Sequence, residues 1–211
     1  MIKYKNLYLL GTSHISKDSV KAVERGVLKI KPEIIALELD KRRYELLSKE
    51  KQKRFGLKEI RSFGIKNFIL NFIGAWFEKK MGKKLGTKPG GEMKKAIALA
   101  KKRKIKIALI DQDIQYTISR LMKLITRREK IRFIKDLILG KEINNFNIKK
   151  VPAQKDIISI INKIKNDYPS FYLTVIKERN EFMAKKLYSL MNRFPRDRIL
   201  SIIGAGHEKA I

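Results

Sequence analysis

The chain contains only two histidines, and each lies three residues after a glycine that ends an apolar run. The first segment reads Leu-Leu-Gly-Thr-Ser-His and ends at His14, and the second reads Ile-Ile-Gly-Ala-Gly-His and ends at His207. Glycine makes up about 7% of average sequence, so two independent histidines would share this offset in about 0.5% of chains. Either histidine alone would more often be an ordinary hydrogen-bonded residue. Glycine lets the backbone turn sharply off a strand, so we expect both imidazoles to point into one crevice at the carboxyl edge of a sheet.

Glu38 directly follows the apolar run 34–37, where a buried parallel strand should carry hydrophobic residues. A carboxylate at such a place costs free energy unless it is paired or bound to a metal ion. The chain has no cysteine, which leaves His, Asp and Glu as the side chains suited to bind a metal. His14, Glu38 and His207 therefore form a candidate two-His-one-carboxylate metal set, or alternatively a metal-free general base with its partners.

Two further charged residues stand where a partner is needed. Glu92 lies in the first turn of an expected helix, where the helix dipole is as good a reason for a carboxylate as a catalytic role. Arg179 alone interrupts an apolar stripe at helical spacing, and a buried arginine needs an anionic partner. We expect that partner to be substrate, Glu38 or Glu92. The stripe consists of Tyr172, Ile176, Met183, Leu187 and Leu190.

Three other charged residues near the same edge have simpler alternatives. Asp40 is expected to cap the helix that follows the second strand. Arg43, one turn into that helix, either reaches the site or stays solvated. Asp111 ends the third strand and is either a further acid or a turn-forming aspartate.

The elements that must position these residues are short strands that alternate with helices. Four apolar, partly β-branched runs predict buried strands at Leu7–Leu10, Glu33–Leu39, Ile105–Ile110 and Ile199–Ile203. This order is typical of an α/β fold with a central, largely parallel or mixed sheet and helices on both faces. Ligands of such sheets bind outside the carboxyl ends of the strands, so the two imidazoles meet if the first and last strands are neighbours.

The helices between the strands carry start signals. They are expected to run from Ser16 to about Ile30, over Lys41–Leu47, over Gly91–Lys102, from Asp113 to about Lys123 and from about Tyr168 to Met191. The expected caps are Ser16, Asp40, Asp113 and Asp167, and Pro169 stands in the first turn of the last helix.

At 211 residues the chain is long enough for one well-buried core and short for two, so we expect a single domain over residues 1–211. A stretch dense in Phe and Ile predicts a helical insertion near residues 57–86, which favours packing or homo-oligomer contacts over membrane contact. Its most apolar run, Phe68–Phe77, is shorter than the roughly 20 residues that a membrane span needs. No charged-then-apolar leader precedes the first expected strand, which favours a cytoplasmic location.

Lys and Arg number 50 against 21 Asp and Glu, which gives a formal charge of +29. Such a charge attracts polyanions, whether nucleic acid or an anionic membrane surface, and a similar composition occurs in heat-adapted proteins. The basic residues are spread through nearly every segment instead of forming one block. We therefore expect no specific nucleic-acid partner, only contacts that ignore sequence and weaken with salt.

These motifs together resemble the TraB/PrgY family, which is related to Tiki-type and GumN-like proteins and, more distantly, to erythromycin-esterase-like proteins. The resemblance covers nearly the whole chain and rests on several ordered motifs, which are more specific than one G-x-x-H. They lie in residues 11–14, 38–44, 89–93, 109–113, 178–184 and 204–207. The chain departs from the family at Gln112, where members often have arginine, and at Asn180, where they often have aspartate.

The resemblance implies a metal-dependent hydrolase of the peptidase type, because Tiki relatives are regarded as metal-dependent peptidases and PrgY-like relatives are linked to limiting peptide pheromone activity. The implied substrate is a peptide or a small anionic molecule. The expected cofactor is a divalent ion, Mn, Co or Zn, held by His14, His207 and Glu38. Glu92 is then the base or a fourth ligand, and Arg43 or Arg179 stabilises the oxyanion.

The alternative function is a non-catalytic regulatory or ligand-binding module at a membrane surface. It would use the same crevice for a small anionic ligand and the basic exterior for lipids. Archaeal members of the family commonly continue into membrane helices. The resemblance therefore implies membrane association through a C-terminal region beyond this chain.

Overall fold

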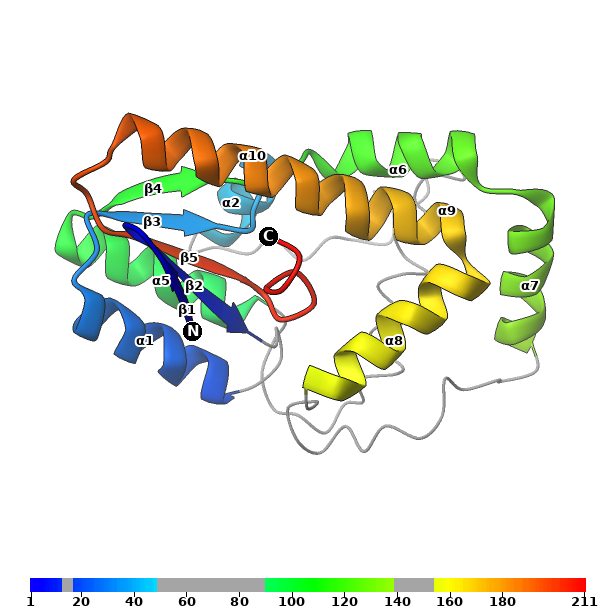
Figure 1. Ribbon diagram of the computed structural model, residues 1–211, viewed down its shortest axis with the longest axis horizontal. Helices are drawn as coiled ribbons and strands as arrows, with labels where there is room; N and C mark the ends of the chain where they lie inside the picture. The colour runs from blue at the N-terminus through cyan, green and yellow to red at the C-terminus, as the bar shows by residue number, and fades with distance from the viewer. Residues whose placement is uncertain (13–16, 49–89, 139–153) are drawn as a thin grey trace.

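The computed structural model describes residues 1–12, 17–48, 90–138 and 154–211, and its centre is a five-stranded sheet (Figure 1). The strand order is β1-β2-β5-β3-β4. β2, β5, β3 and β4 run parallel to one another, and β1 pairs antiparallel with β2. The predicted α/β fold with a largely parallel, mixed sheet is confirmed. The strands are β1 (Ile2–Tyr4), β2 (Leu7–Thr12), β3 (Ile34–Leu37), β4 (Lys106–Leu109) and β5 (Ile199–Gly204).

All four predicted strands are present, and the one that was missed is the edge strand β1. Its three residues are exposed and include Lys3, so it carries no buried apolar run that a sequence pattern could detect. Hydrogen bonds to β2 hold it instead, with Ile2 opposite Leu9 and Tyr4 opposite Leu7. β2 is therefore an inner strand, and its other neighbour is β5.

Helices cover both faces of the sheet, as predicted. α1 (Lys17–Ile30) and α5 (Gly91–Arg103) pack on one face, and α10 (Glu178–Arg193) lies across the other (Figure 1). Every residue of the central strand β5 is buried, and its side chains alternate between the two layers. Leu200, for example, packs beneath α1 and α5, whereas Ile203 packs beneath α10.

A second group of helices extends beyond the carboxyl ends of the strands (Figure 1). These are α6 (Ile114–Leu124), α7 (Arg127–Ile138) and α8 (Gln154–Asp167), while α2 (Lys41–Ser48) follows β3. A long rod then returns over the sheet. It is made of α9 (Pro169–Phe171), the π-helix η1 (Tyr172–Lys177) and α10.

Two predicted helix caps are confirmed. Asp40 Oδ1 accepts a hydrogen bond of 2.8 Å from the backbone N–H of Arg43 in the first turn of α2. The Asp113 side chain accepts from two backbone N–H groups in the first turn of α6.

The prediction that Asp167 caps the long rod is wrong. Asp167 ends α8, and its carboxylate accepts a bond of 3.2 Å from Nη1 of Arg132 on α7. Tyr168 occupies the cap position without a side-chain bond. Pro169, at the start of the rod, has the helical φ built in and no N–H to satisfy, so this start does not require a polar cap.

The π-helical segment changes which residues of the rod face inward. A π-helix has hydrogen bonds from i to i+5 and more residues per turn than an α-helix, so it rotates the faces of whatever follows it. Met183 and Leu187 of the predicted stripe are buried, as expected. Asn180 is also buried, which regular helical spacing did not predict. Leu190 is half-buried and packs against the same core as Met183 and Leu187, whereas Tyr172 and Ile176 are only half-buried.

A buried glutamate anchors the start of the rod. Glu129 of α7 accepts hydrogen bonds of 2.8 Å from the backbone N–H and the hydroxyl of Thr126. It also accepts bonds of 2.7 Å from the N–H and the hydroxyl of Ser170 on α9. Burial by itself raises the pKa of Glu129, but these bonds lower it below the ordinary value. The rod is therefore tied to α7 before it crosses the sheet.

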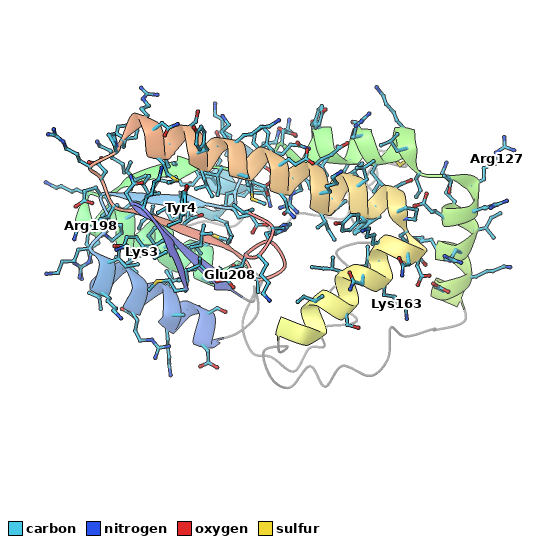
Figure 2. All side chains as sticks on the ribbon, in the orientation of Figure 1. Lys3, Tyr4, Arg127, Lys163, Arg198 and Glu208 are labelled. Carbon is cyan, nitrogen blue, oxygen red and sulfur yellow. The ribbon has the colours of Figure 1, made fainter. Side chains whose placement is uncertain are left out.

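Exposed basic side chains are dispersed over the surface of the described segments. Lys3 on β1 and Arg198 before β5 lie at one end of the ribbon, whereas Arg127 on α7 and Lys163 on α8 lie at the other (Figure 2). Some of these side chains are paired. Arg198, for example, donates hydrogen bonds to Glu33 and lowers the pKa of that carboxyl to about 2. The charge therefore surrounds the fold instead of marking one face.

Several predicted features lie outside the described residues. These are His14, the Ser16 cap, the helical insertion near 57–86 and its apolar run Phe68–Phe77. None of the described helices combines the length and the apolar composition that crossing a lipid bilayer requires.

The register of α10 on the sheet predicts a large difference between two adjacent substitutions. Leu187 is 1% exposed and Tyr188 is 67% exposed. Leu187→Ala should lower the free energy of unfolding by about 2–5 kcal/mol, because it leaves a cavity beneath the helix. Tyr188→Ala should change it by less than about 0.5 kcal/mol. Urea denaturation of both variants measures the difference, and equal losses would contradict the register.

Candidate functional site

The two G-x-x-H turns begin side by side at the carboxyl edge of the sheet. Thr12 at the end of β2 is in register with Gly204 at the end of β5. The backbone N–H of Ala205 donates to the Thr12 carbonyl at 2.9 Å, and the Thr12 hydroxyl donates to the Ile203 carbonyl at 3.1 Å. The expected neighbourhood of the first and last predicted strands is confirmed. His14 itself lies outside the described residues, so its approach to His207 stays a prediction.

The glycine of the first motif lets a carboxylate of the second approach its backbone closely. The backbone N–H of Gly11 donates to Glu208 Oε1 at 3.2 Å. A Cβ atom on Gly11 would lie only 2.5 Å from Glu208 Oε2, so any side chain here would displace that carboxylate. The residue after His207 thus holds the start of the segment that leads to His14.

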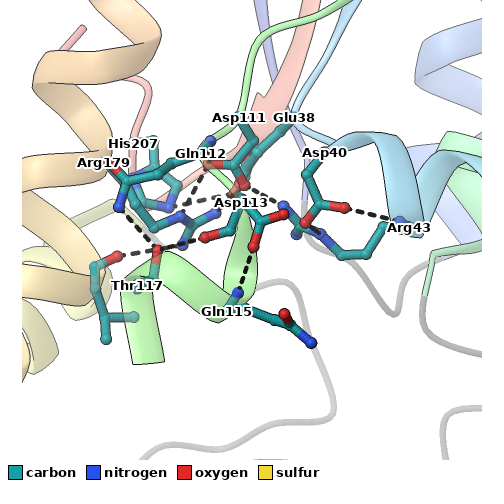
Figure 3. A network of polar contacts seen from close by, with 12 residues as sticks. Glu38, Asp40, Arg43, Asp111, Gln112, Asp113, Gln115, Thr117, Arg179 and His207 are labelled. Atoms are coloured by element: carbon teal, nitrogen blue, oxygen red, sulfur yellow. Dashed lines mark hydrogen bonds and ion pairs between the residues drawn. The ribbon is translucent and has the colours of Figure 1, made fainter. Parts of the chain in front are cut away.

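Glu38, which ends the second predicted strand, is held on both of its oxygens. Its side chain is 4% exposed. Oε1 accepts a hydrogen bond of 2.8 Å from Arg179 Nη2, and Oε2 accepts one of 2.5 Å from the backbone N–H of Gly204. His207 Nε2 lies 3.4 Å from Oε1 (Figure 3). Two of the three predicted metal ligands, Glu38 and His207, are therefore neighbours.

Asp111 is the hub on which both arginines meet (Figure 3). Its side chain is fully buried. It accepts from Arg179 Nε at 3.0 Å and Nη2 at 2.5 Å, and from Arg43 Nη2 at 2.5 Å. Burial opposes ionisation of Asp111, but the bonds and charges of the two arginines outweigh it and lower the pKa of this carboxyl. Asp111 Oδ1 also accepts from the backbone N–H of Gln112 at 2.7 Å, so Asp111 stabilises its turn as well as binding both arginines, and it is not a free acid.

The two arginines differ in how many donors they have left. Arg179 uses Nε and Nη2 on Asp111 and Glu38, and Nη1 on the carbonyl of Val175 in η1 at 3.2 Å. Burial alone would lower the pKa of Arg179, but its carboxylate partners raise it above the ordinary value. The guanidinium is therefore charged and almost fully occupied in holding the site together.

Arg43 is only partly occupied. Its side chain is 32% exposed and bonds Asp40 through Nε at 2.8 Å and Asp111 through Nη2. Nη1 has no hydrogen-bond partner among the described residues. Of the two predicted oxyanion-stabilising arginines, Arg43 is the one with donors to offer.

Asn180 is a site residue that the sequence pattern missed. It is 7% exposed in the first turn of α10, and its Oδ1 contacts His207 Nδ1 in a short hydrogen bond. The available signals were its place directly after Arg179 and the aspartate that the family resemblance leads one to expect at this position. Gln112 donates to the hydroxyl of Thr117 at 2.9 Å and so fixes α6 to the end of β4.

Glu92 is 1% exposed in the first turn of α5. Because α5 runs opposite to the strands, this turn lies at the carboxyl end of the sheet (Figure 1). The helix dipole stabilises a carboxylate there, which agrees with the structural alternative. Glu92 belongs to the helix layer opposite α10.

Carboxylates outnumber arginines in this part of the site. Glu38, Asp40 and Asp111 carry three negative charges against two positive charges on Arg43 and Arg179. Two ligands about 2.1 Å from one ion at a tetrahedral angle lie about 3.4 Å apart, which is the separation of His207 Nε2 and Glu38 Oε1. Within the described residues no group of three or more His, Asp or Glu side chains is arranged to hold a metal ion. The predicted third ligand, His14, is outside them.

The Asp111 hub predicts a specific loss of stability. Asp111→Asn should lower the free energy of unfolding by about 3 kcal/mol, because it leaves two arginines short of a buried counter-charge. Asp113→Asn is the matched control and should be nearly neutral, because Asn caps a helix as well as Asp does. Denaturant unfolding at neutral pH measures both, and similar losses would contradict the role of the hub.

The ion pairs between Asp111 and the two arginines also predict how stability depends on pH. The folded-state pKa of Asp111 is lowered, so its contribution is complete above the unfolded-state pKa of about 3.9 and is lost as pH falls through the folded-state value. Stability should therefore fall less steeply below about pH 4 in Asp111→Asn than in the unmodified protein. If the free energy of unfolding falls equally steeply with pH in both proteins, Asp111 does not make this contribution.

The chain was also compared with known proteins. A family model described as the TraB/PrgY/gumN family matches residues 3–210. An uncharacterized protein of Methanocaldococcus jannaschii is 37% identical over 215 residues, which cover 98% of this chain and 52% of that protein. TraB domain-containing proteins of Bos taurus and Homo sapiens are each 22% identical over 231 residues, which cover 97% of this chain and 61% of theirs. The chain thus spans about half the length of the first of these relatives.

Proposed function

The chain belongs to the TraB/PrgY/gumN family, and from this membership and the site geometry we propose that it is a metal-dependent hydrolase of the peptidase type. The observation that carries the proposal is the pairing of His207 Nε2 with Glu38 Oε1 at 3.4 Å, at the ends of two adjacent parallel strands. A buried imidazole and a buried carboxylate at this spacing suit one divalent ion. The first G-x-x-H turn starts on the next strand, which supports His14 as the third ligand.

In the proposed site the cofactor is Mn, Co or Zn, held by His14, His207 and Glu38. When bound, a divalent ion would activate water and polarise the carbonyl that is attacked. Glu38 is suited to its part because Arg179 and the Gly204 amide hold its carboxylate in one orientation. A ligand that is already held loses little conformational entropy on binding.

The remaining residues have distinct proposed roles. Arg43 stabilises negative charge that develops on the substrate, because it is partly exposed and retains N–H donors. Arg179 acts through Glu38 and Asp111, since its donors are already occupied. Glu92 is the proposed base or fourth ligand, on the grounds of its burial and its place at the carboxyl end of the sheet. The proposed substrate is a peptide or a small anionic molecule that the Arg43 side can accept.

The proposal predicts that metal binding depends on each of the two histidines. His14→Ala and His207→Ala should each abolish binding of Mn²⁺, Co²⁺ and Zn²⁺, while the fold stays nearly intact because crevice residues contribute little packing. Isothermal titration calorimetry on protein purified without a histidine tag measures this. Unchanged affinity in both variants would leave only a metal-free site.

A matched pair of carboxylates tests Glu38. Glu38→Gln should weaken both metal binding and peptide hydrolysis, because the amide is a poorer ligand and carries no charge. Asp40→Asn should affect them less, because Asn still caps α2 and Asp40 is not a proposed ligand. If Asp40→Asn is the more damaging change, Glu38 is not the central carboxylate.

The second candidate function is a non-catalytic regulatory or ligand-binding module at a membrane surface. The formal charge of +29 and its dispersal over the surface favour it. Anionic vesicles should then compete with a random DNA duplex for the protein, and the DNA complex should weaken steeply as salt rises. A sequence-specific DNA or RNA complex that survives physiological salt, without vesicle binding, would make nucleic acid the partner instead.

A further inference from the structure

The contact between His207 and Asn180 determines which ring nitrogen of His207 carries the hydrogen. His207 Nδ1 makes a short hydrogen bond with Asn180 Oδ1. An amide oxygen can only accept, so Nδ1 must be the nitrogen that bears the hydrogen. We propose that Asn180 is a positioning residue that holds His207 in the Nδ1–H tautomer and so leaves Nε2 unprotonated beside Glu38.

The other side of the ring faces the Glu38 carboxylate. Nε2 lies 3.4 Å from Glu38 Oε1, beyond the usual 2.7–3.2 Å of an N–H···O bond. Of these two contacts, the one at Nδ1 is the shorter. If the Asn180 amide were turned by half a revolution, its Nδ2 would face Nδ1 and Nε2 would carry the hydrogen. The two states thus differ in which ring nitrogen is protonated.

The position of Asn180 follows from the π-helix. η1 ends at Lys177, and the first turn of α10 then presents two consecutive residues to the strand ends. Arg179 reaches Glu38 and Asp111, while Asn180 reaches His207. Val175 in η1 accepts from Arg179 Nη1, which ties this turn to the π-helical segment. One helix turn therefore orients both the carboxylate and the imidazole of the site.

The functional role of this tautomer rests on the proposed function, since only an unprotonated Nε2 can bind a metal ion. Ligand histidines are commonly oriented by a hydrogen bond at their other nitrogen, and loss of that partner costs about 10–100-fold in metal affinity. Asn180 would have this effect on His207 without touching the ion or the substrate. It is thus distinct from the three proposed ligands.

The test is the tautomer of His207 in metal-free protein. Long-range ¹H–¹⁵N correlation spectra of ¹⁵N-histidine-labelled protein, recorded at about pH 8.5 and so well above the ordinary histidine pKa of about 6.5, distinguish protonated from bare ring nitrogens. The chain has only two histidines, so His14→Gln assigns the His207 signals by elimination. We expect Nδ1–H in the unmodified protein. A proton on Nε2, or on both nitrogens, would overturn the proposal.

Three variants separate positioning from general structure. Asn180→Leu removes the acceptor at similar volume and should move the hydrogen to Nε2, where Glu38 can accept it. Asn180→Asp keeps an acceptor and should keep Nδ1–H. Asn192→Leu, on the exposed side of the same helix, should change nothing. An unchanged tautomer in Asn180→Leu would overturn the proposal, as would a loss of Nδ1–H in Asn180→Asp.

Zinc titration of the same variants connects the tautomer to the proposed function. Asn180→Leu should lose about 10–100-fold in Zn²⁺ affinity, and Asn180→Asp should retain it. If the unmodified protein binds no divalent ion, the proposed hydrolase fails, but the tautomer measurement still decides the role of Asn180. If the protein binds zinc and His207 carries its hydrogen on Nε2 in the metal-free state, only the role of Asn180 fails.

Discussion

The site depends on one buried carboxylate, Asp111, that is bound by two arginines. A fully buried aspartate at the end of a strand would be costly without compensation. Here Arg179 comes from the helix that crosses one face of the sheet, and Arg43 comes from the helix after β3. Asp111 therefore fixes two helices against the ends of β3 and β4. The geometry of Glu38 follows, because the same guanidinium group of Arg179 that binds Asp111 also binds Glu38.

Short, specific hydrogen bonds from the helices position the residues at the strand ends. Glu129 anchors the start of the long rod, the π-helix rotates its faces, and the first turn of α10 then delivers Arg179 and Asn180 to the site. From the sheet side, the Gly204 amide holds the second oxygen of Glu38. A site assembled in this way is organised before any ligand binds, which is what electrostatic catalysis requires.

The two arginines have different roles in the chemistry that we propose. Arg179 donates to two carboxylates and a backbone carbonyl, so its guanidinium group serves to hold the protein's own residues in place. Arg43 has the same hub as a partner but keeps donors at the rim. Two arginines that are alike in sequence thus have different roles, and the difference comes from burial alone. A substrate group that carries or develops negative charge would meet Arg43 first.

The amino-acid sequence by itself determined the α/β class, the four parallel strands, the caps at Asp40 and Asp113, and the need of Glu38 for a partner, because these follow from local periodicity and from the cost of a charge in an apolar run. It also indicated that both G-x-x-H turns leave the same edge. Only the tertiary structure decided that Asp111 is a hub, that Arg43 and Arg179 share it, and that Asn180 orients His207. These contacts join residues 27 to 68 positions apart, and a π-helix directly precedes the helix that carries Arg179 and Asn180. Local spacing contains no information about such pairings, since burial and charge compensation arise only once the helices pack on the sheet.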